Sequence, residues 1–205
     1  MSLPFLKIFV GPMFSGKTTA LINTYKQLSG DKFIHDMRDG SGNKICVNSK
    51  ISVINHGFDD RYEKNHMCNH DGLKIPCETV TNLKDYIQTK KYHPDTEIFL
   101  INEAQFFDNL FECVVDLVEN KHKQVYLCGL DGDFKRQKMG ELLQLIPIAD
   151  EVVKLSATCN MCKTNKAIFT HRMCNNDEQV VIGGSDIYQP LCRICYLKNN
   201  RSIEL

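Results

Sequence analysis

The sequence predicts an α/β fold: a parallel sheet with helices on both of its faces, followed by a small metal-binding module. Three observations predict it. Short, mostly apolar runs such as residues 5–10 alternate with segments that have the periodicity of amphipathic helices, as in proteins built on buried parallel strands. A glycine-rich turn directly follows the first run, and two Cys-x-x-Cys pairs lie near the C-terminus.

The expected elements follow one another along the chain. Residues 5–10 predict a buried strand, and residues 17–28 predict a helix whose apolar side chains recur at helical spacing. Residues 30–49 are polar and rich in glycine, which predicts an exposed excursion with a short hairpin. Further strands are expected at residues 51–55, 97–101 and 124–128, further helices at 83–90 and 110–119, and a polar loop up to residue 72. Right-handed crossovers between such units give a parallel sheet, whose ligands bind beyond the carboxyl ends of the strands.

The composition excludes several classes of protein. The 205 residues, with 42% hydrophobic content, suffice for one packed α/β domain and a small appendage. Lys plus Arg and Asp plus Glu each number 25, so this neutral chain lacks the basic surface of a non-specific nucleic-acid binder. No stretch approaches the roughly 18 apolar residues of a membrane span, and no signal sequence is visible. We therefore expect a cytoplasmic protein that has neither a membrane nor a nucleic acid as a partner.

The glycine-rich turn fits the P-loop pattern, in which Gly, four residues and Gly precede Lys and Ser or Thr. Its residues are Gly11, Pro12, Met13, Phe14, Ser15, Gly16, Lys17 and Thr18. The backbone N–H groups of such a turn and the start of the following helix form a concave site for phosphates. Lys17 would reach the β- and γ-phosphates, and the Thr18 hydroxyl would bind Mg²⁺. The sequence therefore predicts a P-loop NTPase-like sheet that binds a nucleoside triphosphate.

Other chemistry-bearing residues are predicted at the same edge of the sheet. Glu103 follows the strand at residues 97–101, where its carboxylate could take a proton from a substrate hydroxyl during phosphoryl transfer. The alternative is a helix-capping or salt-bridged surface acid. Asp59 and Arg61 follow another strand, and spacing alone favours a solvent-exposed ion pair there. Asn102 lacks the charge of an Asp, so we expect the metal to depend on Thr18 and the phosphates.

The two Cys-x-x-Cys pairs predict a structural Zn²⁺ site. The four cysteines are Cys159, Cys162, Cys192 and Cys195. Four thiolates form a closed tetrahedral site, which leaves no open position for catalysis and suits a module too small to hold a core alone. The alternatives are four buried free thiols or disulfides, and a reducing compartment disfavours the disulfides. A zinc ribbon by itself would indicate a nucleic-acid or protein contact, whereas beside a P-loop domain it could close over a substrate.

Several of these segments together resemble the type II thymidine kinases. The resemblance covers most of the chain and rests on Gly-Pro-Met-Phe-Ser-Gly-Lys-Thr at 11–18, Asp-Asp-Arg-Tyr at 59–62 with His-Asp at 70–71, Glu-Ala-Gln-Phe-Phe at 103–107, Leu-Asp-Gly-Asp-Phe at 130–134, Val-Lys-Leu at 153–155, the four cysteines, and Val-Ile-Gly-Gly at 181–184 with Tyr188. In this family Asn102 would ordinarily be Asp, and residues 30–49 look like an insertion.

The resemblance implies ATP-dependent phosphorylation of the 5′-hydroxyl of thymidine or deoxyuridine, with Glu103 as the general base and Mg²⁺ bound with the ATP. The residues implied to bind ATP or its phosphates are Gly11, Pro12, Met13, Phe14, Ser15, Gly16, Lys17, Thr18, Asp59, Asp60, Arg61, Asn102, Ala104 and Gln105. Those implied to line the nucleoside pocket are Met13, Phe106, Leu130, Phe134 and Thr170. Those implied to cover the base, largely through backbone hydrogen bonds, are the lasso loop Gln179, Val180, Val181, Ile182 and Gly183, together with Tyr188.

The resemblance also implies an organisation and a regulation. A P-loop nucleotide-binding domain at residues 1–157 would precede a zinc-ribbon-like lasso domain at residues 158–205, which closes over the nucleoside. The family implies a homotetramer and feedback inhibition by thymidine triphosphate.

Two other functions compete with this one. The first is a P-loop kinase for another nucleoside or nucleotide. The second is a non-catalytic nucleotide sensor whose zinc ribbon binds nucleic acid or a partner. Asn102 is the main support for the sensor, whereas the neutral charge and the retained Glu103 count against it.

Overall fold

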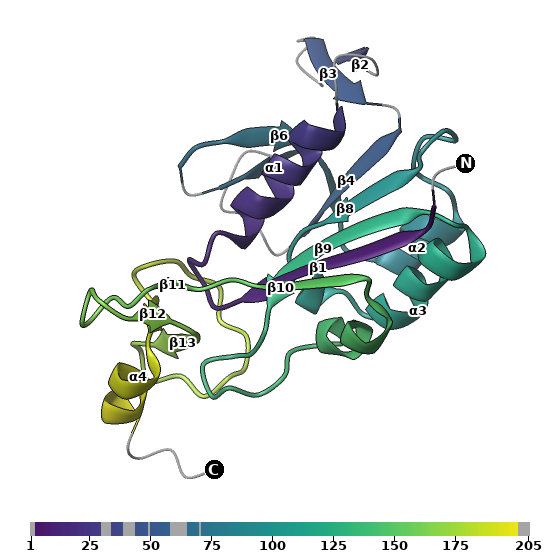
Figure 1. The fold of residues 1–205 in the computed structure, drawn as a ribbon. Helices are drawn as coiled ribbons and strands as arrows, with labels where there is room; N and C mark the ends of the chain where they lie inside the picture. Colours follow the sequence, from purple (N-terminus) through teal and green to yellow (C-terminus); the bar gives the residue numbers. More distant parts are fainter. Residues whose placement is uncertain are drawn as a thin grey trace.

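A computed structural model describes residues 3–29, 34–38, 44–48, 50–57, 65–69 and 71–200, with only the backbone described for 34–38 and 44–48. Within these residues, six parallel strands form the central sheet (Figure 1). They are β1 (Phe5–Gly11), β4 (Ile51–His56), β7 (Glu78–Val80), β8 (Ile98–Ile101), β9 (Gln124–Leu130) and β10 (Glu151–Lys154). Their order across the sheet is β10-β1-β9-β8-β4-β7, and every pairing is parallel. The predicted parallel sheet is thus confirmed.

Helices cover both faces of this sheet, as predicted. Helix α1 (Lys17–Ser29) packs on one face, and α2 (Leu83–Gln88) and α3 (Leu110–Val115) pack on the other (Figure 1). Because side chains alternate along a strand, Val53 of β4 joins the α1 core while its neighbour Ile54 joins the core with α2 and α3. The central strands are buried from both sides, which explains why their sequences read as nearly continuous apolar runs.

Several elements differ from the prediction in extent. Strands β7 and β10 were not predicted, because they are short edge strands whose residues are largely exposed. The expected polar loop contains an antiparallel hairpin of β5 (His66–Cys68) and β6 (Lys74–Pro76). The predicted hairpin in residues 30–49 is present as β2 (Ile34–Arg38) and β3 (Lys44–Asn48). Helix α3 continues as a π-helical turn at Asp116–Asn120, so the predicted helical span is confirmed with altered geometry.

Short 3₁₀ segments complete the sheet domain. They lie at Ala104–Phe106, directly after β8, and at Leu142–Ile148, before β10. Leu142 and Leu145 of the second segment join the core on the α2 and α3 face. In the part of the chain that the structure describes, no helix is long and apolar enough to cross a bilayer.

A small module follows the sheet. Strand β11 (Ala157–Thr158) pairs with β12 (Lys166–Ala167), and β13 (Phe169–Arg172) pairs with β14 (Tyr188–Leu191), which leads into α4 (Arg193–Asn199). Its buried core consists of Cys159, Ala167, Leu191, Cys192, Cys195 and Tyr196. Three of these six residues are cysteines, so apolar burial alone gives little stability to this module. The domain boundary predicted between residues 157 and 158 lies within β11 and stays a prediction.

The buried Phe99 of β8 tests the importance of this sheet core. Its side chain is fully buried and meets Tyr92 edge to face, with ring centroids 5.0 Å apart. Phe99→Ala is expected to lower the free energy of unfolding by about 3–5 kcal/mol, because a large cavity opens in a packed core. Phe111→Ala is the matched control, since Phe111 is 37% exposed and should lose far less. Denaturant unfolding of both variants measures the difference, and equal losses would contradict the core assignment.

Candidate active site

The P-loop joins β1 to α1 and has the backbone of a phosphate site. Phe14 and Gly16 adopt left-handed conformations, with φ of 62° and 80°. Such reversals turn successive N–H groups towards one concave point, next to the N-terminus of α1. Gly16 has no atom within 4 Å of the position that a Cβ would occupy, so the loop is open there. The buried hydroxyl oxygen of Ser15 has no hydrogen-bond partner among the described residues, as expected if its partner is a bound phosphate group.

The polar side chains of Lys17 and Thr18 have hydrogen-bond partners within the protein. The Lys17 ammonium is buried and donates to the Pro12 carbonyl oxygen at 2.7 Å. The Thr18 hydroxyl lies 3.4 Å from Oδ1 of Asn102, which follows β8. The same oxygen accepts from the Cys128 thiol of β9, and the Asn102 amide donates to Asn55 Oδ1 of β4 at 2.8 Å. Asn102 is therefore a buried neutral link between three strands and the P-loop.

Glu103 extends from the end of β8 with an unusual backbone. Its φ of 51° and ψ of 41° are left-handed, a conformation that costs roughly 1–2 kcal/mol for a residue with a Cβ. Its carboxylate accepts from Gln105 Nε2 at 2.7 Å, and Gln105 Oε1 accepts from the Leu130 N–H at 3.1 Å. The end of β9 thus orients Glu103 through Gln105.

Two glycines make room for Gln105. A Cβ on Gly129 would lie 2.4 Å from Gln105 Oε1, and a Cβ on Gly140 would lie 2.2 Å from its carbonyl oxygen. At Gly140, where φ is 52° and the obstacle is backbone, the position requires glycine, whereas a side chain at position 129 would displace the end of the Gln105 side chain. Gln105 is 3% exposed and lies behind Glu103, out of contact with the cavity.

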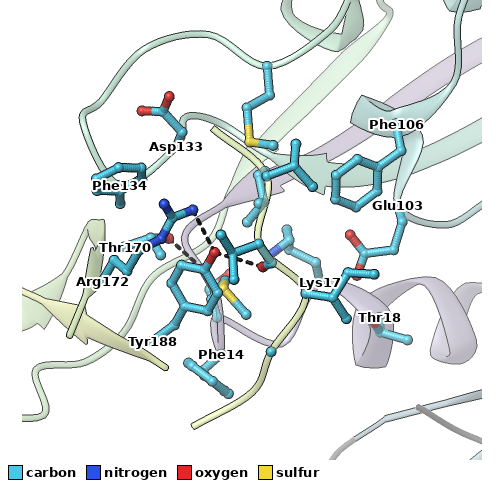
Figure 2. A pocket seen from close by; sticks show the side chains of 18 of the residues that line it. Phe14, Lys17, Thr18, Glu103, Phe106, Asp133, Phe134, Thr170, Arg172 and Tyr188 are labelled. Atoms are coloured by element: carbon cyan, nitrogen blue, oxygen red, sulfur yellow. Dashed lines mark hydrogen bonds between the residues drawn. The ribbon is translucent and has the colours of Figure 1, made fainter. Parts of the chain in front are cut away.

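One cavity collects the predicted residues. Figure 2 shows Glu103, Lys17 and Thr18 on one side of it, and Phe134, Arg172 and Tyr188 on the other. Eleven residues that the family resemblance places against the nucleoside line it: Met13, Phe106, Leu130, Phe134, Thr170, Gln179, Val180, Val181, Ile182, Gly183 and Tyr188. Of the predicted phosphate-site residues, the structure brings Met13, Phe14, Ser15, Gly16, Lys17 and Thr18 to the same cavity, together with Glu103, the predicted general base.

Some predicted residues lie elsewhere. The lining residues do not include Gly11, Pro12, Asn102, Ala104 and Gln105, which lie behind the cavity wall. Ala104 is fully buried in the core on the α2 and α3 face, and its predicted role in ATP binding stays a prediction. Asp59, Asp60 and Arg61 lie outside the described residues.

Sequence reasoning missed other lining residues: Thr19, Cys68, Asn69, Asp133, Met139 and Arg172. Asn69 is 5% exposed, and its amide donates to the Thr19 hydroxyl at 2.9 Å, which anchors the β5–β6 hairpin to α1. Asp133 accepts the N–H groups of Lys135 and Gln137, both at 2.8 Å, and so shapes the turn after β9. Asp133 in the Leu-Asp-Gly-Asp-Phe segment was a sequence signal for such a turn, since aspartate side chains often accept hydrogen bonds from nearby backbone N–H groups.

A buried histidine supports the cavity wall. His56 ends β4 and lies against Phe106 and Phe107, with ring centroids 5.7 Å and 4.6 Å away. Burial lowers the pKa of His56 below its ordinary value, and the nearby Asp108 carboxylate opposes this effect. The imidazole is therefore uncharged at neutral pH and acts as an aromatic packing partner for Phe106.

The second module contacts the P-loop directly. The backbone N–H of Met13 donates to the Thr170 hydroxyl of β13 at 3.0 Å. The hydroxyl of the buried Tyr196 in α4 donates to the Phe134 carbonyl oxygen. Tyr196 directly follows Cys195, and Met13, Phe134 and Thr170 line the cavity, so the module is attached where the cavity forms.

The four predicted cysteines converge. Their sulfur atoms all lie within 4.8 Å of one another, and the Cys162 and Cys192 sulfurs are 3.9 Å apart. Tetrahedral Zn²⁺ with bonds of about 2.3 Å requires sulfur separations of about 3.8 Å, so the donor set and its spacing fit zinc. Hydrogen bonds from the Thr164 hydroxyl and from the N–H groups of Asn165 and Thr164 lower the pKa of Cys162 to about 5. Burial and the neighbouring thiols raise the pKa of Cys195 to about 12.

A cavity with a phosphate loop on one side and an enclosed, largely apolar wall on the other can bring a nucleotide and a second small molecule together. The fold and the site thus define the class: a P-loop α/β protein whose phosphate loop lines one cavity together with a largely apolar wall. A sequence model of the family described as thymidine kinase matches residues 4–196. The chain therefore belongs to the thymidine kinase family.

Individual relatives agree with the family match. The thymidine kinase of Oryza sativa subsp. japonica is 37% identical over 202 residues, which cover 97% of this chain and 68% of the relative. The thymidine kinase of Choristoneura biennis entomopoxvirus is 36% identical over 198 residues, which cover 95% of this chain and 97% of the relative. The thymidine kinase of Mycoplasma mobile is 31% identical over 193 residues, which cover 94% of this chain and 87% of the relative.

Removal of the metal should unfold the second module selectively. Structural zinc supplies roughly 10–16 kcal/mol of apparent binding free energy in modules of this size, far more than the small core provides. Cys162→Ser, or chelation of the wild type, is expected to increase hydrogen exchange across β11 to α4 while β1, β8 and β9 stay protected. Cys174→Ser is the matched control, because Cys174 is exposed and outside the cluster. Unchanged exchange after complete metal removal would contradict a structural zinc site.

Proposed function

We propose that this chain transfers the γ-phosphoryl group of ATP to the 5′-hydroxyl of thymidine or deoxyuridine. Membership of the thymidine kinase family supports the reaction, and the relatives are named for thymidine. The observation that carries the proposal is the position of Glu103: one cavity holds this carboxylate, the P-loop and the residues proposed for the nucleoside. Donor phosphate and acceptor hydroxyl can therefore meet beside a proton acceptor.

Each group has a proposed role in the transfer. Glu103 accepts the proton of the 5′-hydroxyl, held in orientation by Gln105. Lys17 and the P-loop N–H groups bind the phosphates and stabilise the charge that spreads over the transferred group. The Val181 and Ile182 segment covers the base, and its apolar side chains exclude water from the cavity.

A divalent cation belongs to this proposal. Mg²⁺ would bind the Thr18 hydroxyl and phosphate oxygens, with the side-chain Oδ1 of Asn102 nearby, and this all-oxygen set suits the ion. When bound, it neutralises phosphate charge. Zn²⁺ would have a structural role at the four cysteines, because these leave no coordination position for a substrate.

The remaining expectations extend the proposal. The homotetramer, the inhibition by thymidine triphosphate and the cytoplasmic location stay predictions. The phosphate-site roles of Asp59, Asp60 and Arg61 also stay predictions. No observation on the described part of the chain favours the non-catalytic sensor, since the cavity holds Glu103 and Lys17 together.

A phosphate-transfer assay tests the function. The zinc-loaded protein is incubated with γ-labelled ATP, Mg²⁺ and, separately, thymidine, deoxyuridine, deoxycytidine and a purine deoxynucleoside. Transfer to thymidine or deoxyuridine is the expected result. Transfer to another nucleoside alone would favour the kinase of different specificity, and ATP binding without any transfer would favour the sensor.

Glu103→Gln isolates proton transfer from binding. The amide keeps the size of the side chain but cannot accept the proton, so kcat is expected to fall by about 10²-fold or more. ATP binding, measured by calorimetry, should stay unchanged. Glu97→Gln, directly before the opposite end of β8 and half-buried, is the matched control with normal turnover. A Glu103→Gln enzyme of near-normal turnover would remove Glu103 from the mechanism.

Asn102→Asp tests the neutral metal site. A carboxylate next to Thr18 adds attraction for Mg²⁺, so the Mg²⁺ concentration for half-maximal activity should fall by about tenfold, or about 1.4 kcal/mol. Asn82→Asp makes the same charge change at the exposed N-cap of α2, and its Mg²⁺ curve should match the wild type. A Mg²⁺ titration of turnover gives both values. An Asn102→Asp curve that is unshifted, or shifted to higher Mg²⁺ concentration, would contradict the prediction.

A further inference from the structure

The guanidinium of Arg172 is buried in the cavity wall at the end of β13. The residue is 5% exposed and follows Thr170 by two positions, so both side chains point to the same side of the hairpin. Within the described residues, no carboxylate forms an ion pair with it. A buried charge without a counter-charge is costly unless several good acceptors surround it, so its surroundings need a reason.

Those acceptors are backbone carbonyl oxygens of one loop. Nη1 donates to the carbonyl oxygens of Asn176, at 2.8 Å, and of Glu178. Nη2 donates to the Gln179 carbonyl oxygen at 3.1 Å. The chain from residue 176 to residue 179 therefore wraps around the planar guanidinium, which can supply several donors in a fixed geometry.

The same group reaches the lasso loop through Tyr188. Nη2 of Arg172 also donates to the Tyr188 hydroxyl at 2.8 Å, and that hydroxyl donates to the Val181 carbonyl oxygen at 2.8 Å (Figure 2). The guanidinium carbon lies 3.8 Å from the centroid of the Phe134 ring, within the range of a cation–π contact. Arg172 thus joins the lasso loop, the β13–β14 hairpin and the turn after β9.

A second tie to that turn is made by a side chain of the loop. Gln179 Nε2 donates to Asp133 Oδ2 at 2.9 Å and to the Lys138 carbonyl oxygen at 3.1 Å. At the surface, Lys135 forms an ion pair with Asp177 at 3.0 Å. The loop is therefore anchored by a buried cation on one side and by polar contacts to residues 133–138 on the other.

We propose that Arg172 is the positioning residue that holds residues 176–183 closed over the acceptor pocket. The inference rests on the proposed function for the identity of the acceptor, a pyrimidine deoxynucleoside. Because its donors bind backbone carbonyls, Arg172 sets the path of the main chain irrespective of the side chains in the loop. The main-chain atoms that face the cavity then keep a fixed position before the nucleoside arrives, which reduces the ordering cost of binding.

The first test compares Arg172→Met with the wild-type, zinc-loaded enzyme in steady-state kinetics. Met keeps the buried length of the chain but removes the donors, so KM for thymidine should rise by about tenfold or more, since charged hydrogen bonds are lost. KM for ATP should change by less than about twofold. Arg172→Lys keeps the charge without the fork and should give an intermediate KM for thymidine. Equal rises in both KM values would overturn the proposal.

A matched control uses the surface contact between the same two segments. Lys135→Ala removes the exposed ion pair to Asp177 and should change KM for thymidine by less than about twofold. Tyr188→Phe interrupts the path from Arg172 to Val181 while keeping the ring. In the double variant Arg172→Met/Tyr188→Phe, KM for thymidine should lie within about twofold of the value for Arg172→Met alone, because both substitutions act through one path. Fully multiplicative effects would contradict a shared path.

The second test needs no substrate. Hydrogen exchange of the ligand-free, zinc-loaded protein should accelerate by about tenfold or more at amides 176–183 in Arg172→Met, while α1 and β9 are unchanged. Unchanged exchange in the loop would overturn the proposal. If Arg172→Met fails to fold, Arg172→Lys and Tyr188→Phe give the same readout. If the wild type phosphorylates no nucleoside, yet exchange at amides 176–183 is still faster in Arg172→Met than in the wild type, the proposed function is refuted and the positioning role is kept.

Discussion

Every functional segment of this chain depends on one constraint, that parallel strands end at the same edge of a sheet. Gly11 at the end of β1 lies in register with Leu130 at the end of β9, and β8 ends beside β9 with Ile101 opposite Leu127. The P-loop, the Glu103 turn and the turn after β9 are consequently neighbours although they are some 30 to 115 residues apart in sequence. The buried strands hold these turns at fixed separations, because their side chains are packed on both faces.

The small module adds what the sheet edge cannot provide. An open edge exposes the phosphate loop but cannot enclose an apolar ligand, and the β13–β14 hairpin supplies the missing wall. One end of this hairpin lies at the thiols, since Cys192 directly follows β14, and the other end carries Arg172 and Tyr188 into the cavity. A metal bound at the cysteines therefore stabilises the cavity wall from a distance of a few residues, without any contact to a ligand.

The sequence was informative where a residue acts through local pattern. The P-loop, the strand before it, the helix after it and the cysteine spacing depend on neighbours in sequence, and the structure confirms the sheet and the convergence of the thiols. The edge strands β7 and β10 escaped prediction because exposed polar residues give no alternation to detect. Arg172 escaped because its partners are loop carbonyls and the ring of Phe134, and no composition or spacing marks such partners. The pocket residues came from family resemblance, since main-chain contacts leave almost no signature in side chains.

The left-handed backbone of Glu103 carries an evolutionary consequence. A glycine or asparagine would adopt this conformation at lower cost, so selection for folding alone would favour replacement of this residue. With Glu103 in its proposed role as general base, selection for phosphoryl transfer would act in the opposite direction and retain the carboxylate. Laboratory evolution for thermostability without an activity screen should therefore accumulate inactive variants at this position, and a glutamate that persists there reports that the chain is still under selection for turnover.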